Sequence, residues 1–247
     1  MQKFFLKVRF FCLTFFAFMS VVLMILLFRQ KLVSDDAFKM TYPEVVFENK
    51  ILFDRDLAIS SLRDLIVPFL EQDKLLDLDI VALSNEIMVL PWVENVSVIR
   101  DFPNVLKIII KPKEVIAYKA NENGYYPIDK NGKVLNMSVE YQNGLLVFGE
   151  EAEENLLTLL EYLKNYPNIM KNVVGVQFVN KLRWNLLFFN MDESGILVKL
   201  DNDFEEGLSK LAELEFLQGI LSKNISEIDL RDLDKILVKQ RGNYGVW

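Results

Sequence analysis

Carboxylates are the only abundant side chains in this sequence that could take part in acid–base chemistry. The 247 residues include 35 Asp and Glu, no histidine, and a single cysteine, Cys12. The absence of histidine excludes Ser-His and Cys-His nucleophilic arrangements and nearly all zinc sites. A carboxylate pair could still serve a hydrolase, but acids at this abundance mostly form a solvated surface. We therefore predict that the chain is not an enzyme and needs neither a cofactor nor a metal.

An uncharged apolar segment lies close to the N-terminus, from Phe10 to Phe28. At about 1.5 Å per residue a helix over this segment is about 28 Å long, close to the roughly 30 Å of a bilayer hydrocarbon core. It lacks the polar stripe of a surface helix. The segment is longer than the apolar region of a signal peptide, and Arg29 and Lys31 follow it directly. We predict an uncleaved transmembrane helix at 10–28, with a cleaved signal peptide as the alternative.

The distribution of charge predicts the orientation of this helix. Basic residues favour the cytoplasmic side, which places the tail 1–9 inside and the remainder outside, after a connector at 29–42. Residues 1–31 hold five of the 28 Lys and Arg and none of the 35 acids, so the rest of the chain has a net charge of −12. This acidity argues against a nucleic-acid partner and against adhesion to an anionic membrane surface. Cys12 lies in the predicted span, which leaves the exported part without disulfides.

The segment 43–112 has the pattern of one small α+β domain. Asp56 and Asp79 are placed to cap two helices, and Pro68 is expected to end the first of them. Trp92 stands between a helix and a strand, so we expect it to be buried. Two helices on one face of a three-stranded sheet would make a compact unit. The expected elements are a strand at 45–47, helices at 57–67 and 79–90, and strands at 93–100 and 105–111.

The segment 113–241 is expected to be a β-rich domain with two helices, followed by a tail at 242–247. Three Asn-Gly dipeptides, at 123–124, 131–132 and 143–144, predict hairpin turns because each supplies a residue that accepts positive φ. Leucine stripes predict the helices and alternation predicts the strands. The expected helices are 151–164 and 204–221, and the expected strands are 173–180, 182–190, 196–200, 225–230 and 235–240.

Several motifs together resemble those of one known family. Residues 90–108 read LPWVENVSVIRDFPNVLKI, residues 126–135 read YPIDKNGKVL, and Arg183-Trp184 and the run 228–231, IDLR, follow in the same order. They resemble segments of FtsQ, the single-span cell-division protein called DivIB in Gram-positive bacteria, which has a POTRA domain and a second, β-rich domain. One departure is Asp232, which stands where the family often has an aromatic residue.

The resemblance implies a function without catalysis. Members of this family are understood as scaffolds of the bacterial divisome, held in the inner membrane with the N-terminus in the cytoplasm and the body in the periplasm at the division septum. The implied partners are FtsB and FtsL, together with FtsW and FtsI, and no small-molecule substrate is implied. Two alternatives are another single-span POTRA protein of a transport or secretion assembly, and an anchored enzyme that acts on the cell wall through two buried carboxylates.

The last predicted strand is the candidate partner site. A terminal strand at a sheet edge leaves N–H and C=O groups unpaired, and the resemblance implies that FtsB adds a segment along it. The period of two places Ile236 and Val238 on one face and Leu237 and Lys239 on the other. The alternative is that the lysines only protect the edge from aggregation. The candidate residues are Lys235, Ile236, Leu237, Val238, Lys239 and Gln240.

Overall fold

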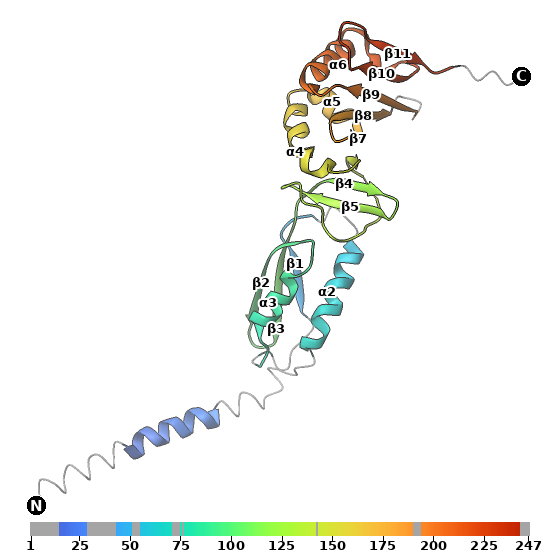
Figure 1. Cartoon of the computed structure of the whole chain (residues 1–247). Helices are drawn as coiled ribbons and strands as arrows, with labels where there is room; N and C mark the ends of the chain where they lie inside the picture. Colours follow the sequence, from blue (N-terminus) through green and yellow to red (C-terminus); the bar gives the residue numbers. More distant parts are fainter. Residues whose placement is uncertain are drawn as a thin grey trace, which may run out of the picture. The chain divides into compact units, whose positions relative to one another are not determined.

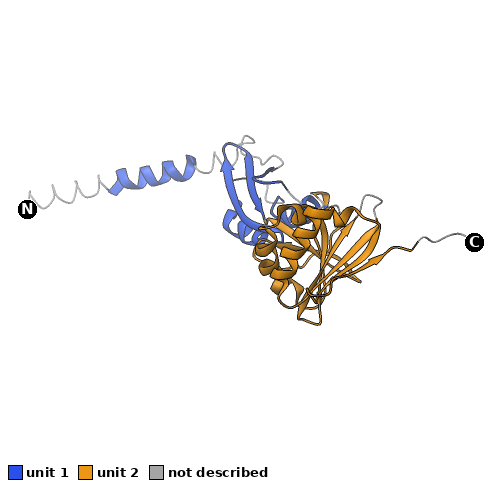
Figure 2. Ribbon diagram, turned by 90° about the horizontal axis from the view of Figure 1, so that it is seen from above, with its two compact units in different colours: residues 1–50, 57–112 blue, residues 51–56, 113–247 orange. Residues whose placement is uncertain are grey.

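The computed structural model describes residues 15–28, 43–50, 55–70, 75, 77–141, 143–189 and 194–242. Residues 15–28 form a helix with almost every side chain exposed, while the rest of the predicted span and the connector lie outside the described residues. Within the described part of the chain, no helix is both long and apolar enough to cross a membrane, so the span at 10–28 stays a prediction. The chain divides into two compact units, residues 1–50 with 57–112 and residues 51–56 with 113–247 (Figure 2).

The first unit has the β-α-α-β-β order that the sequence predicts. Its sheet has the order β1-β3-β2, with β1 parallel to β3 and β2 antiparallel to it. Asp79 caps the second helix, because its carboxylate accepts from the backbone N–H groups of Val81 and Ala82 at 3.0 Å each. The elements are β1 (Glu44–Phe47), α2 (Arg55–Leu70), α3 (Ile80–Met88), β2 (Val93–Asp101) and β3 (Val105–Pro112).

Trp92 is buried in this unit, as predicted, with 1% of its surface exposed. Its indole Nε1 donates to Ser61 Oγ of α2 at 3.3 Å, and its ring lies 6.2 Å from that of Phe47 in β1. The alternating side chains Leu106, Ile108 and Ile110 of β3 are fully buried. Trp92 therefore joins a helix and a strand in one apolar core.

Two expectations about α2 are wrong. The helix begins at Arg55, so Asp56 lies in its first turn, where a negative charge favours the helix dipole, and not at the cap position. The helix also continues past Pro68 to Leu70. A proline so close to the C-terminal end removes only the hydrogen bond to Asp64, and the last turn can form without it.

The second unit is an eight-stranded mixed sheet with the order β11-β10-β9-β8-β7-β6-β4-β5 (Figure 1). The pairs β4–β6, β6–β7 and β9–β10 are parallel, and the other pairs are antiparallel. The strands are β4 (Val115–Asn121), β5 (Gly124–Asp129), β6 (Leu146–Phe148), β7 (Val173–Val179), β8 (Arg183–Phe189), β9 (Gly195–Leu200), β10 (Ile225–Leu230) and β11 (Leu237–Gln240). The helices are α4 (Ala152–Leu163), α5 (Pro167–Asn172), α6 (Phe204–Gln218) and the 3-10 turn η2 (Ile220–Ser222).

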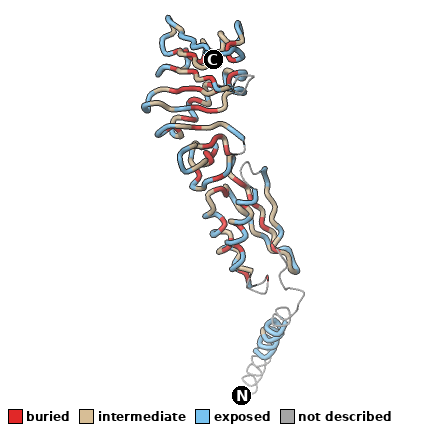
Figure 3. The backbone as a smooth tube through the Cα atoms, turned by 90° about the vertical axis from the view of Figure 1, so that its right-hand side faces the viewer, coloured by how far each residue is buried: buried red, intermediate tan, exposed pale blue. Residues whose placement is uncertain are grey.

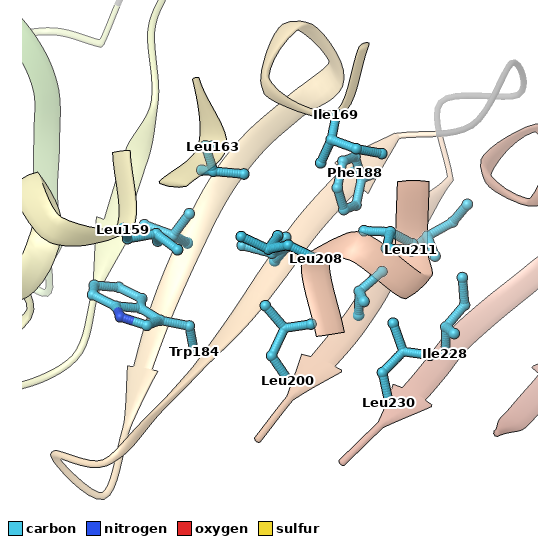
Figure 4. Close-up of a cluster of buried hydrophobic side chains, with 14 of the residues drawn as sticks. Leu159, Leu163, Ile169, Trp184, Phe188, Leu200, Leu208, Leu211, Ile228 and Leu230 are labelled. Atoms are coloured by element: carbon cyan, nitrogen blue, oxygen red, sulfur yellow. The ribbon is translucent and has the colours of Figure 1, made fainter. Parts of the chain in front are cut away.

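The core of the second unit lies between the helices and the central strands (Figure 4). Leu159 and Leu163 of α4 and Leu208 and Leu211 of α6 are fully buried. Trp184 of β8 packs in the same cluster, with its ring 4.7 Å from that of Phe178. The leucine stripes of α4 and α6 therefore mark core faces, as predicted. Buried positions also alternate with more exposed ones along β9, and Figure 3 shows buried and more exposed positions interspersed along the chain.

The helix predicted at 151–164 is confirmed by α4, whereas two other expectations about the helices of this unit are wrong. A short helix, α5, begins at Pro167, a residue that favours the first helical position, and it was not predicted. The expected helix at 204–221 breaks at Gly219, whose φ of 56° is left-handed. Glycine accepts this conformation without steric strain, so the chain turns there and continues as η2.

The third Asn-Gly dipeptide does not close a hairpin. Asn123-Gly124 joins the antiparallel strands β4 and β5, as predicted, and Ile128 bridges to Val134 across the second dipeptide. Gly144 instead precedes β6, which lies parallel to both of its neighbours. A parallel strand cannot be entered through a tight hairpin.

Candidate partner-binding edge

The strand β11 is the outermost strand at one end of the eight-stranded sheet. It pairs with β10 and has no second neighbour among the described residues. An outer strand has one row of backbone N–H and C=O groups that no other strand of the sheet satisfies. All four residues of β11 are exposed, including 54% of Leu237 and 43% of Val238. This end of the sheet is therefore the candidate site.

The other end of the sheet is covered by the chain itself. The segment after β5 folds back along that strand, and the N–H groups of Leu135 and Val139 donate to the carbonyls of Pro127 and Tyr125 at 2.7 and 2.9 Å. Isolated bridges mark the same return. A sheet of this length commonly protects its edges in this way, and β11 is the end that lacks such a cover.

The strand at this edge is shorter than predicted. It begins at Leu237, so Lys235 and Ile236 precede it, while Val238, Lys239 and Gln240 belong to it as expected. The reason lies in Asp232, whose carboxylate accepts from the N–H of Asp234 at 3.1 Å and whose carbonyl accepts from the N–H of Lys235 at 3.2 Å. This turn holds the chain away from β10 until Leu237.

The register of β11 decides which way its side chains point. Leu237 and Lys239 lie opposite Asp229 and Glu227 of β10, whereas Val238 lies opposite the buried Ile228. Ile236, just before the strand, is half-buried against the core. The predicted alternation of faces is therefore confirmed. The face of this edge on the core side carries the apolar Ile236 and Val238, and the opposite face carries the aliphatic Leu237 and the basic Lys239.

A long-range contact of Arg241 holds the end of β11 in place, and a second arginine contact lies within the end of β10. Arg241 follows the strand, and its Nη2 donates to the carbonyl of Gly195, 46 residues away, at 2.6 Å. At the end of β10, Arg231 donates from Nε to the carboxylate of Asp229 at 2.8 Å. This hydrogen bond from Arg231 lowers the pKa of Asp229 against the opposing effect of burial. No local pattern in the sequence indicates the role of Arg241, because its partner Gly195 lies 46 residues away along the chain.

The buried polar and charged residues of the described ranges include one carboxylate. Asp129 is the buried carboxylate among them, with 5% exposed. Its Oδ1 accepts from the N–H groups of Asn131 and Lys133 at 2.9 and 3.0 Å. These bonds shape the turn after β5, so the carboxylate has a structural role.

A β-α-α-β-β unit followed by a helix-covered sheet with one uncovered edge defines the class as POTRA-containing proteins with a second β domain. Family models agree with this assignment. Residues 66–111 match the model described as "POTRA domain, FtsQ-type", and residues 117–231 match "Cell division protein FtsQ/DivIB, C-terminal". The chain belongs to the FtsQ/DivIB family of cell division proteins.

Curated relatives support the assignment. The chain is similar to cell division protein FtsQ of Rhizobium radiobacter, with 26% identity over 67% of this chain and 78% of that protein. It is similar to FtsQ of Caulobacter vibrioides strain NA1000, with 24% identity over 81% and 67%. It is also similar to FtsQ of Rickettsia conorii, with 28% identity over 60% of this chain and 55% of that protein, so the match spans about half the length of that relative.

Solved structures are also similar to the chain. One of them is the major extracytoplasmic domain of the cell division protein DivIB from Geobacillus stearothermophilus, with 15% sequence identity and a TM-score of 0.30. The match covers 43% of this chain and 95% of that domain.

Proposed function

We propose that the chain is a non-enzymatic scaffold of the bacterial divisome that binds partners through the open edge at β11. The observation that carries the proposal is that β11 has one neighbour in the sheet while the return segment covers β5 at the other end. The partners we propose are FtsB and FtsL, with FtsW and FtsI in the same assembly. The scaffold would link the FtsB–FtsL pair to septal peptidoglycan synthesis.

The mode of binding we propose is β-augmentation. A segment of FtsB would pair with the outward backbone groups of β11, which supply affinity, while alternate side chains supply specificity. Leu237 and Val238 expose apolar surface on opposite faces of the strand, so an added strand could bury side chains on both. The contact of Arg241 with the carbonyl of Gly195 restrains the end of β11 before a partner binds, which lowers the entropy lost on binding.

The recruitment of the protein to the septum tests this function. We expect a fluorescent fusion of the full chain to form a mid-cell band in dividing cells, since a divisome scaffold acts where the septum forms. A fusion that carries Val238→Pro should bring less FtsB to the same band. Uniform membrane fluorescence of the unaltered fusion would overturn the proposal, whereas a band without FtsB would place the partner site elsewhere.

We propose the layout that the sequence predicts: cytoplasmic tail 1–9, span 10–28, connector 29–42, POTRA domain 43–112, β domain 113–241 and tail 242–247. A reporter fused after Trp247 is expected to be active only as a periplasmic enzyme, because one uncleaved span with a cytoplasmic tail places the C-terminus outside. Activity of a cytoplasmic reporter would contradict this topology. A mature chain that starts after residue 31 would show a cleaved signal peptide.

The alternative remains a single-span POTRA protein of a transport or secretion assembly. Such proteins usually carry tandem POTRA units or a long C-terminal barrel, and the described residues contain one β-α-α-β-β unit and an open sheet. The localisation experiment separates the two functions, since a transport component has no reason to concentrate at the septum.

A further inference from the structure

A cleft of about 790 Å³ opens in the second unit, at the opposite half of the sheet from β11. Its walls come from α4, from the junction of α5 with β7, and from the residues that lead into β6 (elements in Figure 1). Ile116, Leu145 and Leu160 line it and are half-buried against the core. Leu157 and Met170 also line it and expose 39% and 40% of their surface. The cleft therefore has an apolar floor that solvent reaches.

Three lysines surround this floor. Lys130, Lys164 and Lys171 are charged lining residues, and Glu161 is the one acid in the lining. Glu161 is paired with Lys164, at 2.6 Å between Oε2 and Nζ. The lining has a formal charge of +2, from three lysines and one glutamate, on a chain whose net charge is −7. A positive, partly apolar cleft on an acidic protein favours an anionic ligand.

Stabilisation of helix dipoles explains the placement of only two of the three lysines. Lys164 is the C-cap of α4 and Lys171 lies in the last turn of α5, where cations stabilise the helix dipole. Lys130 belongs to the turn after β5, so it reaches the cleft from a third element. Helix stabilisation also does not require Leu157 and Met170 to be left exposed beside the lysines. The combination of three separate elements around one apolar floor points to a ligand.

We propose that this cleft binds a short segment of a partner polypeptide that combines acidic and apolar side chains. Its volume is within the range of binding pockets, roughly 300–1,000 Å³, and suits a few residues of peptide. Carboxylates would meet Lys130, Lys164 and Lys171, and an apolar side chain would cover Leu157 and Met170. A nucleic acid would require a wider basic surface, and an anionic bilayer would repel the acidic remainder of the chain. The site is separate from β11 and does not depend on the proposed function.

The test uses the full chain in non-ionic detergent and a fluorescent peptide of alternating Glu and Leu. Fluorescence anisotropy should show saturable binding that weakens with added salt, while a matched peptide of alternating Lys and Leu should not bind. The double variant Lys164→Gln/Lys171→Gln is expected to bind the acidic peptide about fivefold more weakly. Leu157→Ser should also weaken binding, because it removes apolar contact area.

The matched control is Lys210→Gln on α6. Lys210 forms an ion pair with Glu213 three residues away, at 2.7 Å, and so resembles Lys164 without lining the cleft. This variant should bind the acidic peptide as the unaltered chain does. Absence of saturable binding, equal affinity for both peptides, or an unchanged affinity of the double variant would overturn the proposal. Binding to anionic lipid vesicles that the double variant loses, with no peptide binding, would assign the cleft to lipid instead.

Discussion

Proline at Leu237 or at Val238 is expected to reduce capture of FtsB by about 10- to 100-fold, the loss associated with one or two backbone hydrogen bonds at a desolvated edge. Successive N–H groups along a strand point to opposite neighbours, and proline has none. The N–H at one of these two positions therefore faces β10, and the N–H at the other faces the incoming segment. Proline removes the N–H donor at whichever position it occupies. Both variants should weaken binding, but only the variant that loses the donor facing β10 should loosen β11 itself.

Pull-down of FtsB by the full chain, with circular dichroism as the check on folding, measures this effect. Lys239→Ala is the milder comparison, because Lys239 is exposed and an exposed charge contributes less than about 1 kcal/mol, or about fivefold. If the lysines serve only to protect the edge, both prolines should leave capture unchanged. Full capture by two folded proline variants would place the partner on another surface.

Trp92→Ala is expected to destabilise the first unit by about 3–5 kcal/mol, because it removes a large side chain that is 1% exposed and leaves a cavity between α2 and the sheet. The substitution also leaves Ser61 Oγ without the indole N–H that it accepts from at 3.3 Å. Trp92→Phe should be milder, since it keeps an aromatic ring in the core but not the donor.

Urea unfolding, followed by a probe placed in the first unit, gives the free energy. Val81→Ala in α3 is the matched control, because Val81 is 65% exposed and its substitution should change the stability by less than about 0.5 kcal/mol. An unfolding midpoint for Trp92→Ala equal to that of Val81→Ala would show that Trp92 does not anchor this core.

The sequence by itself determined most local elements of this protein. Alternation along Leu106, Ile108 and Ile110 identified the buried face of β3, and Asp79 marked the start of α3. The motif around Trp92 and the run Ile228 to Arg231 indicated the family. These features depend on residues close together in the chain, whose period or capping chemistry is visible without knowledge of the fold.

Tertiary structure alone decided which strands far apart in the sequence became neighbours. Gly144 leads into β6, which lies parallel to β4 and β7, and a sequence period does not specify the direction of a distant partner strand. The return segment through Leu135 covers β5, and Arg241 reaches Gly195 to hold β11. Lys130 lines the same cleft as the helix-end residues Lys164 and Lys171 for the same reason. Such contacts arise only when segments far apart in sequence are packed on one sheet, so the cover over β5, the restraint on β11 and the cleft are properties of the fold.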